Sequence, residues 1–222
     1  MKLVPNASYL FPLLALVAAG CGSSHGHGGP LGHRFEDAEE WAPRWNDPAR
    51  DEWQKPEHLV ELLEIRPGMT VADLGTGTGY FLPHLSRAVG ETGTVLALDI
   101  EADMIRYVKE LAAKGGLANV QARVVPFDDP EIPEGEVDRV LVVNTWHHIP
   151  DREAYSKKLA RSLAPGGSVA VVDFTLESEH GPPKSERIDP ERVAGELRAA
   201  GLAVRVVQES LPDQYVVVAS RP

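Results

Sequence analysis

Short apolar runs rich in β-branched residues alternate with helical segments along most of this chain, and this alternation restricts its fold more than any other feature. Five such runs occupy Thr70 to Leu74, Thr94 to Ile100, Val120 to Val125, Val137 to Val143 and Ser168 to Phe174. Helical segments follow the first, second and fourth. Alternating strands and helices favour parallel strands, and a parallel sheet is covered by helices on both faces. The sequence therefore predicts an α/β fold with a mostly parallel sheet.

The C-terminal part of the chain continues this pattern and then departs from it. Asp151 and Asp189 are suitable N-caps for two further helices. After the second helix, the runs Ala203 to Glu209 and Gln214 to Ala219 follow each other with a short turn between them. Two strands joined in this way form an antiparallel pair, so the chain is expected to end in a β-hairpin.

The strongest chemical signal is the glycine-rich stretch that follows the first predicted strand. Gly75, Gly77 and Gly79 allow a sharp turn and let a ligand approach where a Cβ would collide. Asp99 lies at the end of the second predicted strand, 20 residues after Gly79. A carboxylate at that position can accept hydrogen bonds from both ribose hydroxyls of a nucleoside. The two features together predict a site for a nucleoside-containing cofactor.

The details of the glycine stretch argue against a nicotinamide dinucleotide. The dinucleotide fingerprint has glycine or alanine at the sixth place, where this chain has Tyr80, whose bulk opposes close packing of helix on sheet. Asp73 would repel a pyrophosphate, but it suits an amino-acid tail that carries an ammonium group. The Tyr-x-x-x-Lys pair of short-chain dehydrogenases is also missing, because Tyr155 is followed four residues later by Leu159. An NAD-dependent oxidoreductase is the less favoured interpretation.

From about Pro56 to Ser220 the chain resembles the class I S-adenosylmethionine-dependent methyltransferases, particularly their small-molecule branch. Val71 to Tyr80 resembles the family's first motif, Asp99 its ribose-binding acid, and Leu163 to Gly167 its Leu-x-Pro-Gly-Gly turn. The resemblance implies a Rossmann-like three-layer sandwich with a seven-stranded, mostly parallel sheet, in which the C-terminal hairpin adds one antiparallel strand beside the fifth. It also implies S-adenosyl-L-methionine as cofactor, bound by Asp73, Gly75, Thr76, Gly77, Gly79, Tyr80, Asp99, Ile100, Phe127, Asp128 and Asn144.

One position departs from the family pattern. Pro126 stands where the family usually has an aspartate that meets the adenine amino group. Phe127 could offer its backbone N–H and the face of its ring, and Asp128 could supply the missing acceptor. Alternatively, Asp128 and Asp129 are solvated turn residues.

The segment after the fourth predicted strand contains the candidate catalytic residues, because open α/β folds bind ligands at the carboxyl edge of the sheet. Methyl transfer from a sulfonium is an in-line displacement, so a base is needed only when the accepting atom carries a proton. His147 and His148 are suited to that task because histidine titrates near neutrality. Adjacent residues point in different directions, so we expect one of them, with His147 preferred, to face the site. The alternative is that both histidines only cap the next helix or bind backbone groups.

Tryptophans gather before the first strand and beside the histidines. Trp41 and Trp45 lie four residues apart, on one helix face. The family resemblance implies that residues 35–55 form an N-terminal helical lid over the cofactor and acceptor. An aromatic face near a sulfonium is favourable by about 0.5–2 kcal/mol. We therefore expect Trp53 and Trp146 to line the substrate pocket. The alternative for the N-terminal group is a helix that simply packs on the core.

The first 34 residues differ from the rest of the chain. An apolar run from Tyr9 to Gly20 ends at Cys21, and the residues before this cysteine resemble a bacterial lipoprotein cleavage box. Residues 1–21 are therefore expected to be a lipoprotein-type signal segment, with Cys21 as the lipidated residue. A mis-chosen start codon and an uncleaved membrane-associated segment are the alternatives. Residues 22–34 are predicted to be a flexible linker rich in glycine and histidine, and the methyltransferase domain is expected to span residues 35–222.

Composition limits the partners. The chain has 33 Asp and Glu residues against 22 Lys and Arg residues, and its net charge of -11 makes nucleic acid an unfavourable partner. One cysteine excludes a multi-thiolate zinc site, and glycine-rich neighbours leave His25, His27 and His33 unorganised, so no metal site is expected. The sequence does not indicate an oligomeric state.

These features together predict a methyltransferase that acts on a small organic acceptor and is held at the membrane by an N-terminal lipid anchor. If the signal is genuine, the protein belongs to the cell envelope, and otherwise it is cytoplasmic. An exported protein would meet little S-adenosylmethionine. A non-catalytic protein of the same fold, binding S-adenosylmethionine or S-adenosylhomocysteine as a sensor or scaffold, is therefore the alternative.

Overall fold

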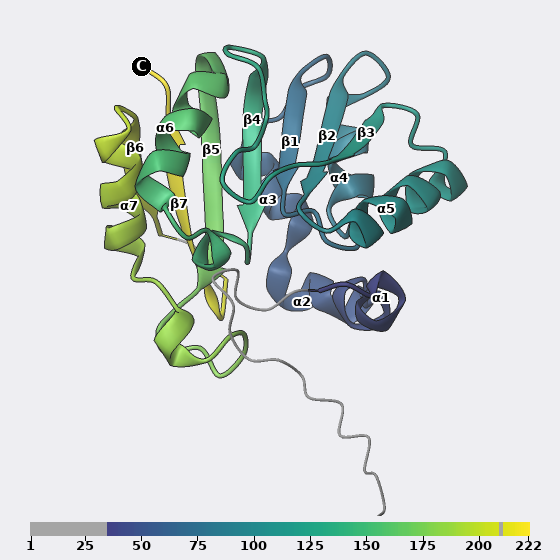
Figure 1. The fold of residues 1–222 in the computed structure, drawn as a ribbon, viewed down its shortest axis with the longest axis horizontal. Helices are drawn as coiled ribbons and strands as arrows, with labels where there is room; N and C mark the ends of the chain where they lie inside the picture. Colours follow the sequence, from purple (N-terminus) through teal and green to yellow (C-terminus); the bar gives the residue numbers. More distant parts are fainter. Residues whose placement is uncertain (1–34, 209–210) are drawn as a thin grey trace, which may run out of the picture.

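A seven-stranded sheet lies at the centre of the computed structural model, which describes residues 35–208 and 211–222 (Figure 1). Its strand order is β3-β2-β1-β4-β5-β7-β6. All neighbouring strands are parallel except β7, which runs antiparallel to both β5 and β6. The strands are β1 (Thr70–Leu74), β2 (Thr94–Asp99), β3 (Val120–Val124), β4 (Val137–Val143), β5 (Leu163–Phe174), β6 (Ala203–Val207) and β7 (Gln214–Ser220). The predicted sheet, with one antiparallel strand beside the fifth, is confirmed.

The fifth strand begins earlier than the sequence predicted. Val137 of β4 pairs with Leu163, and Arg139 pairs with Ser168, so the register shifts between these two pairs. Gly166, with a φ of 74°, lies inside this irregular stretch. The predicted turn before strand five is therefore a bulge within β5, because both of its ends pair with β4.

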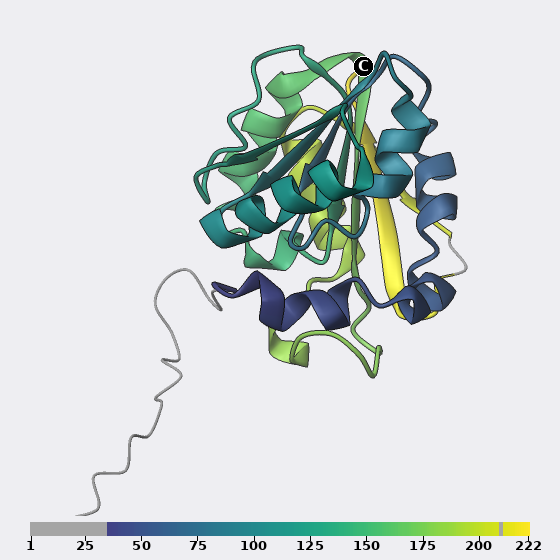
Figure 2. The ribbon, with the colours of Figure 1, turned by 90° about the vertical axis from the view of Figure 1, so that its right-hand side faces the viewer.

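Helices cover the sheet on both sides, which gives the three layers that the sequence predicted (Figure 2). One apolar cluster joins α3 and α4 to the sheet through residues such as Leu59 and Leu85, and the other joins α6 and α7 through Leu159 and Leu197. Asp151 and Asp189 cap α6 and α7 as predicted. The helices are α1 (Ala38–Trp45), α2 (Asp51–Gln54), α3 (Pro56–Leu62), α4 (Leu82–Val89), α5 (Ala102–Gly115), α6 (Arg152–Ser162) and α7 (Pro190–Ala199), with short 3-10 turns η1 (Pro48–Arg50), η2 (Trp146–His148) and η3 (Lys184–Glu186).

The central strands are apolar on both faces because both faces are buried. Val71 and Ala72 are adjacent in β1 and fully buried, yet Val71 belongs to the α3/α4 cluster and Ala72 to the α6/α7 cluster. Successive side chains of a strand point to opposite faces, so a sheet covered twice needs an unbroken apolar run. This explains why the strands were recognisable from short apolar runs.

The segment before β1 lies at the carboxyl edge of the sheet. In Figure 1, α1 and α2 are below the end toward which the β4 arrow points. Residues 35–55 are largely helical. The predicted signal segment and linker, with Cys21, fall outside the described residues. Within 35–208 and 211–222, no helix is both long and apolar enough to cross a lipid bilayer.

Candidate active site

The glycine stretch forms a tight loop between β1 and α4. Gly75, Gly77 and Gly79 have φ values of 73°, 53° and 81°, a region in which side chains are disfavoured. A Cβ at Gly75 would lie 2.3 Å from Oγ1 of Thr145. The loop therefore needs glycine for its backbone conformation and, at Gly75, for the close approach of the chain that leaves β4.

Asp99 lies at the end of β2, next to this loop. Its Oδ2 accepts the N–H of Gly77 at 2.8 Å, and its Oδ1 accepts the N–H of Glu101 at 3.0 Å. Burial raises the pKa of this carboxyl, while the two backbone hydrogen bonds act in the opposite direction. An ionised carboxylate has about four lone-pair sites, so acceptor capacity is left beyond the two backbone bonds.

Asp73 is buried beneath the same loop. Its Oδ2 accepts the hydroxyl of Thr76 at 2.7 Å. Burial raises its pKa to about 6, although the Thr76 hydrogen bond and the charge of Arg50 oppose the shift. Two carboxyl groups at the ends of adjacent strands thus lie against one glycine loop, and the predicted residues Asp73, Thr76, Gly77 and Asp99 are brought together.

A histidine and an aspartate meet at the ends of β4 and β5. Nδ1 of His147, in η2, lies 2.8 Å from Oδ2 of Asp173 and 2.9 Å from Oδ1. The backbone N–H of Phe174 also donates to Oδ1 of Asp173. The ring of His148 is 4.1 Å from that of His147 and 5.9 Å from that of Phe35, so His148 faces the N-terminal segment.

Sequence reasoning missed Asp173. Its one signal was an acidic residue near the end of an otherwise apolar predicted strand, at the edge where the histidines were expected. A buried acid at that position requires a partner. Only the pairing of β4 with β5 shows that the partner is His147.

A chain of side-chain amides joins the N-terminal segment to the sheet. Arg50 donates to Oε1 of Gln54, whose amide donates to Oε1 of Gln214 at 2.7 Å. Gln214 in turn donates to Oδ1 of Asn144 at 2.6 Å. Asn144 was predicted as a cofactor residue, and its Oδ1 accepts this hydrogen bond. The residue directly follows β4 and has a φ of 54°.

Three further predicted cofactor residues, Ile100 and the two adenine candidates Phe127 and Asp128, are all exposed to solvent. Ile100 and Phe127 are 41% and 44% exposed, unusual for large apolar side chains next to a core. The Asp128 carboxylate is 61% exposed and lies 3.6 Å from Nζ of Lys158, whose 3.2 Å contact with Asp129 is shorter. These two acids thus share one lysine on α6.

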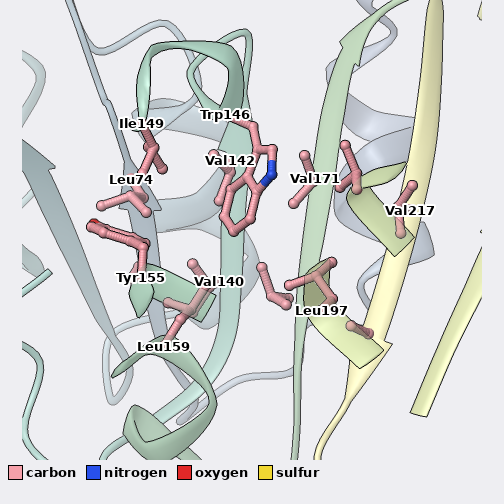
Figure 3. Close-up of a cluster of buried hydrophobic side chains, with 14 of the residues drawn as sticks. Leu74, Val140, Val142, Trp146, Ile149, Tyr155, Leu159, Val171, Leu197 and Val217 are labelled. Carbon is pink, nitrogen blue, oxygen red and sulfur yellow. The ribbon is translucent and has the colours of Figure 1, made fainter. Parts of the chain in front are cut away.

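Trp146 does not line a pocket, contrary to the sequence prediction. It is fully buried and packs against Val142, Val171 and Leu197 in the α6/α7 cluster (Figure 3). Its indole N–H donates to Oε2 of Glu196 at 3.0 Å. The first turn after β4 points this side chain into the core, where its N–H finds a buried acceptor.

The other tryptophans lie over the carboxyl edge. Trp41 and Trp45 stack with ring centroids 5.1 Å apart, as their spacing in one helix predicted. A Cβ at Gly77 would lie 3.2 Å from the ring of Trp45, so this ring covers the glycine loop. Trp53 lies beside β5, with its ring centroid 6.3 Å from that of Phe174.

An acidic group lies apart from this site. Oxygen atoms of Asp37, Glu39 and Asp103 fall within 4.8 Å of one another. Arg106 donates to Asp103 and Glu39. Asp37 instead caps α1 by accepting the N–H of Glu40, so each of the three carboxylates has a partner within the protein.

The site suits a nucleoside with a zwitterionic tail. Asp99 offers acceptors for sugar hydroxyls beside the loop, Asp73 offers a carboxylate for an ammonium group, and Ile100 and Phe127 offer exposed apolar faces for a base. A buried carboxyl with a raised pKa is stabilised when a cation joins it. The residues present therefore fit the cofactor that the sequence implied.

A family model described as a methyltransferase domain matches residues 65–200, more than half of the chain. A nocamycin O-methyltransferase from Saccharothrix syringae is 30% identical over 162 residues, which are 73% of this chain and 55% of that protein. A ubiquinone/menaquinone biosynthesis C-methyltransferase from Hydrogenovibrio crunogenus is 30% identical over 124 residues, 55% of this chain and 48% of that protein. The chain spans about half the length of the curated relatives it matches.

One solved structure matches the fold of this chain over its own full length. The crystal structure of a SAM dependent methyltransferase from Aquifex aeolicus superposes with a TM-score of 0.78 at 32% identity. The match covers 85% of this chain and 100% of the other.

Proposed function

Since this chain belongs to the methyltransferase-domain family of S-adenosylmethionine-dependent enzymes, we propose that it methylates a small organic acceptor at an atom that first loses a proton to His147. The observation that carries the proposal is the buried contact between His147 and Asp173 at the carboxyl edge of the sheet. That edge is also where the glycine loop and Asp99 lie.

The cofactor supplies an electrophilic methyl group on a sulfonium. The residues of this chain that would hold it are Asp99 at the ribose, Asp73 at the ammonium of its amino-acid tail, and Ile100 and Phe127 at the adenine. The glycine loop borders the proposed ribose site, because the N–H of Gly77 donates to the Asp99 carboxylate. Trp45 covers the loop at Gly77.

His147 can remove a proton from the acceptor. With Nδ1–H donated to Asp173, Nε2 carries the free lone pair and is the basic nitrogen. Asp173 fixes this tautomer and stabilises the imidazolium that forms, as acids paired with catalytic histidines do. Oriented general bases typically contribute 10²–10⁴-fold in rate.

The names of two relatives support an acceptor of this type. One is an O-methyltransferase and the other a C-methyltransferase. A hydroxyl oxygen and an acidic carbon both lose a proton during methylation, whereas a neutral amine attacks with its own lone pair. We therefore infer a hydroxylated aromatic or enolic acceptor.

The test has two stages. Calorimetry of the full-length chain with S-adenosylhomocysteine and with NAD is expected to show binding of the first and none of the second. Transfer of labelled methyl from S-adenosylmethionine is then measured on phenols, enols and amines. Methylation confined to amines would contradict a role for His147 as base.

The second candidate function is a sensor or scaffold that binds the cofactor without turnover. The predicted lipoprotein-type signal favours it, because a domain outside the cytoplasm would meet little S-adenosylmethionine. Binding of S-adenosylhomocysteine without methyl transfer to any acceptor class would support this candidate.

We also propose that the protein is anchored in the cell envelope through a lipid on Cys21. The support is the apolar run that ends in small residues before this cysteine. A net charge of -11 further argues against nucleic acid as a partner. If the signal is not genuine, the protein is expected to be cytoplasmic.

A further inference from the structure

The guanidinium of Arg50 lies beside the glycine loop. Its Cζ is 4.0 Å from the ring centroid of Tyr80, the residue that follows Gly79. Tyr80 is held in turn by a hydrogen bond from its hydroxyl to Asp51. The short segment from η1 to α2 thus places a positive charge against the loop that the cofactor is expected to touch.

Neutral groups hold this cation in place. Nη1 donates to the carbonyl of Trp45 at 2.9 Å, and Nε and Nη2 donate to Oε1 of Gln54 at 3.3 and 2.9 Å. Gln54 is itself buried and fixed by Gln214 of β7. A guanidinium has five N–H donors, and these contacts use three of them, so donors remain for an anionic ligand.

The charges around Arg50 are only partly compensated. The titratable groups that face it are Tyr80, Asp73 and Asp51, and burial lowers the pKa of Arg50 to about 10 despite them. Burial also disfavours the charged form of Asp73, and it raises the pKa of this carboxyl to about 6. A ligand that brings one negative and one positive charge would relieve both groups.

We propose that Arg50 binds the α-carboxylate of the cofactor's amino-acid tail, while Asp73 binds the ammonium on the same carbon. The inference rests on the proposed function and extends it to a residue outside the predicted set. Arginine suits the role because its planar fork matches a carboxylate and its donors are already oriented. The segment before β1 is then part of the cofactor site and selects for the intact amino acid.

The test compares two nucleosides that differ in one group. S-Adenosylhomocysteine carries the carboxylate, and 5′-deoxy-5′-(3-aminopropylthio)adenosine lacks it but keeps the amine. Calorimetry on the full-length chain is expected to show S-adenosylhomocysteine binding about ten- to a hundredfold more tightly, the range for a charge-assisted hydrogen bond.

Variants of Arg50 test whether its side chain causes the difference in affinity between the two nucleosides. In Arg50→Gln, the affinity for S-adenosylhomocysteine falls until the two nucleosides bind about equally, while the affinity for the aminopropyl compound is unchanged. Arg50→Lys keeps the charge without the fork and retains part of the difference. Arg44→Gln, an exposed arginine of α1, keeps the wild-type ratio.

Three results would overturn the inference: a wild-type protein that binds both nucleosides equally, an Arg50→Gln variant with the wild-type ratio, and one that loses both affinities to the same extent. The last would show that Arg50 only holds the segment in place. Failure of the wild-type chain to bind either nucleoside is a different outcome, because it removes the proposed function as well.

Discussion

His147 and Asp173 form a buried pair, with Nδ1 and Oδ2 2.8 Å apart and side chains only 4% and 3% exposed. The two residues come from different strand ends, His147 from the turn after β4 and Asp173 from β5. A buried acid is costly unless it is paired, so the contact fixes both side chains. The contact uses Nδ1 of His147 and not Nε2.

The first prediction concerns this pair. His147→Gln is expected to lower turnover by about 10²–10⁴-fold with the affinity for S-adenosylhomocysteine intact, because only the base is removed. Asp173→Asn is expected to lower kcat as well, since an amide no longer selects the tautomer with a basic Nε2. Steady-state kinetics and calorimetry separate the two quantities.

His84→Gln is the matched control. His84 of α4 also forms a histidine–acid pair, in which its Nδ1 lies 3.0 Å from Oε1 of Glu57 on α3. Its turnover is expected to stay at the wild-type level. Equal turnover in His147→Gln would reduce His147 to a structural residue.

Asp99 gives the second prediction. Asp99→Ala is expected to weaken S-adenosylhomocysteine binding by about 1.5–3 kcal/mol, the loss of a hydrogen-bonded charged acceptor. The control is Asp138→Ala, which also removes a carboxylate that accepts a backbone N–H, that of Thr70, at the other end of β1. An unchanged calorimetric titration of Asp99→Ala would refute the ribose assignment.

The third prediction is a pH dependence set by Asp73. Because its pKa is raised to about 6, the carboxyl ionises over the range in which cofactor binding is measured. Affinity for S-adenosylhomocysteine is expected to rise as pH increases from about 5 to 7, since only the carboxylate attracts the ammonium. 5′-Methylthioadenosine has no ammonium, so its affinity is expected to lack this component.

Asp73→Asn removes the titrating group, and the two ligands are then expected to follow the same pH profile. The folding stability of the unliganded protein has the opposite pH dependence to ligand affinity. A carboxyl whose pKa is raised on folding contributes stability below its ordinary value of 3.8, and that contribution is lost as pH rises through about 6. If the ratio of the affinities of the wild-type protein for S-adenosylhomocysteine and 5′-methylthioadenosine stays constant between pH 5 and 7, Asp73 does not bind the ammonium group.

Two glycines with nearly the same φ give the fourth prediction. Gly75 and Gly166 have φ values of 73° and 74°, but a Cβ would meet Thr145 at 2.3 Å in the first and nothing within 4 Å in the second. Gly166→Ala is expected to cost about 1 kcal/mol of strain. Gly75→Ala adds overpacking of about 1–3 kcal/mol. Denaturant unfolding measures both, and equal losses would show that the Thr145 contact relaxes freely.

The fifth prediction concerns the N-terminus. Cys21→Ser is expected to move the protein from membrane to soluble fractions, because the lipidated thiol would be absent. Fractionation with antibody detection checks this. Retention of the variant in the membrane would argue against lipidation at Cys21 and in favour of an uncleaved segment.

The sequence by itself determined the layers of the fold, the glycine bend and the place of Asp99. These features depend on residues that are adjacent in the sequence. A short apolar run predicts a buried strand, and glycines between a strand and a helix predict a tight turn. The family resemblance predicted one antiparallel strand beside the fifth, and β7 lies there, between β5 and β6.

Only the tertiary structure decided which polar residues meet. Asp173 reaches His147 because β4 and β5 pair, and Gln54 reaches Gln214, 160 residues away, because β7 lies beside β5. Trp146 was predicted at a pocket and lies in the core, since one turn of η2 decides which side of the backbone it takes. Such contacts depend on sheet order and on side-chain direction within a turn, and local sequence carries neither.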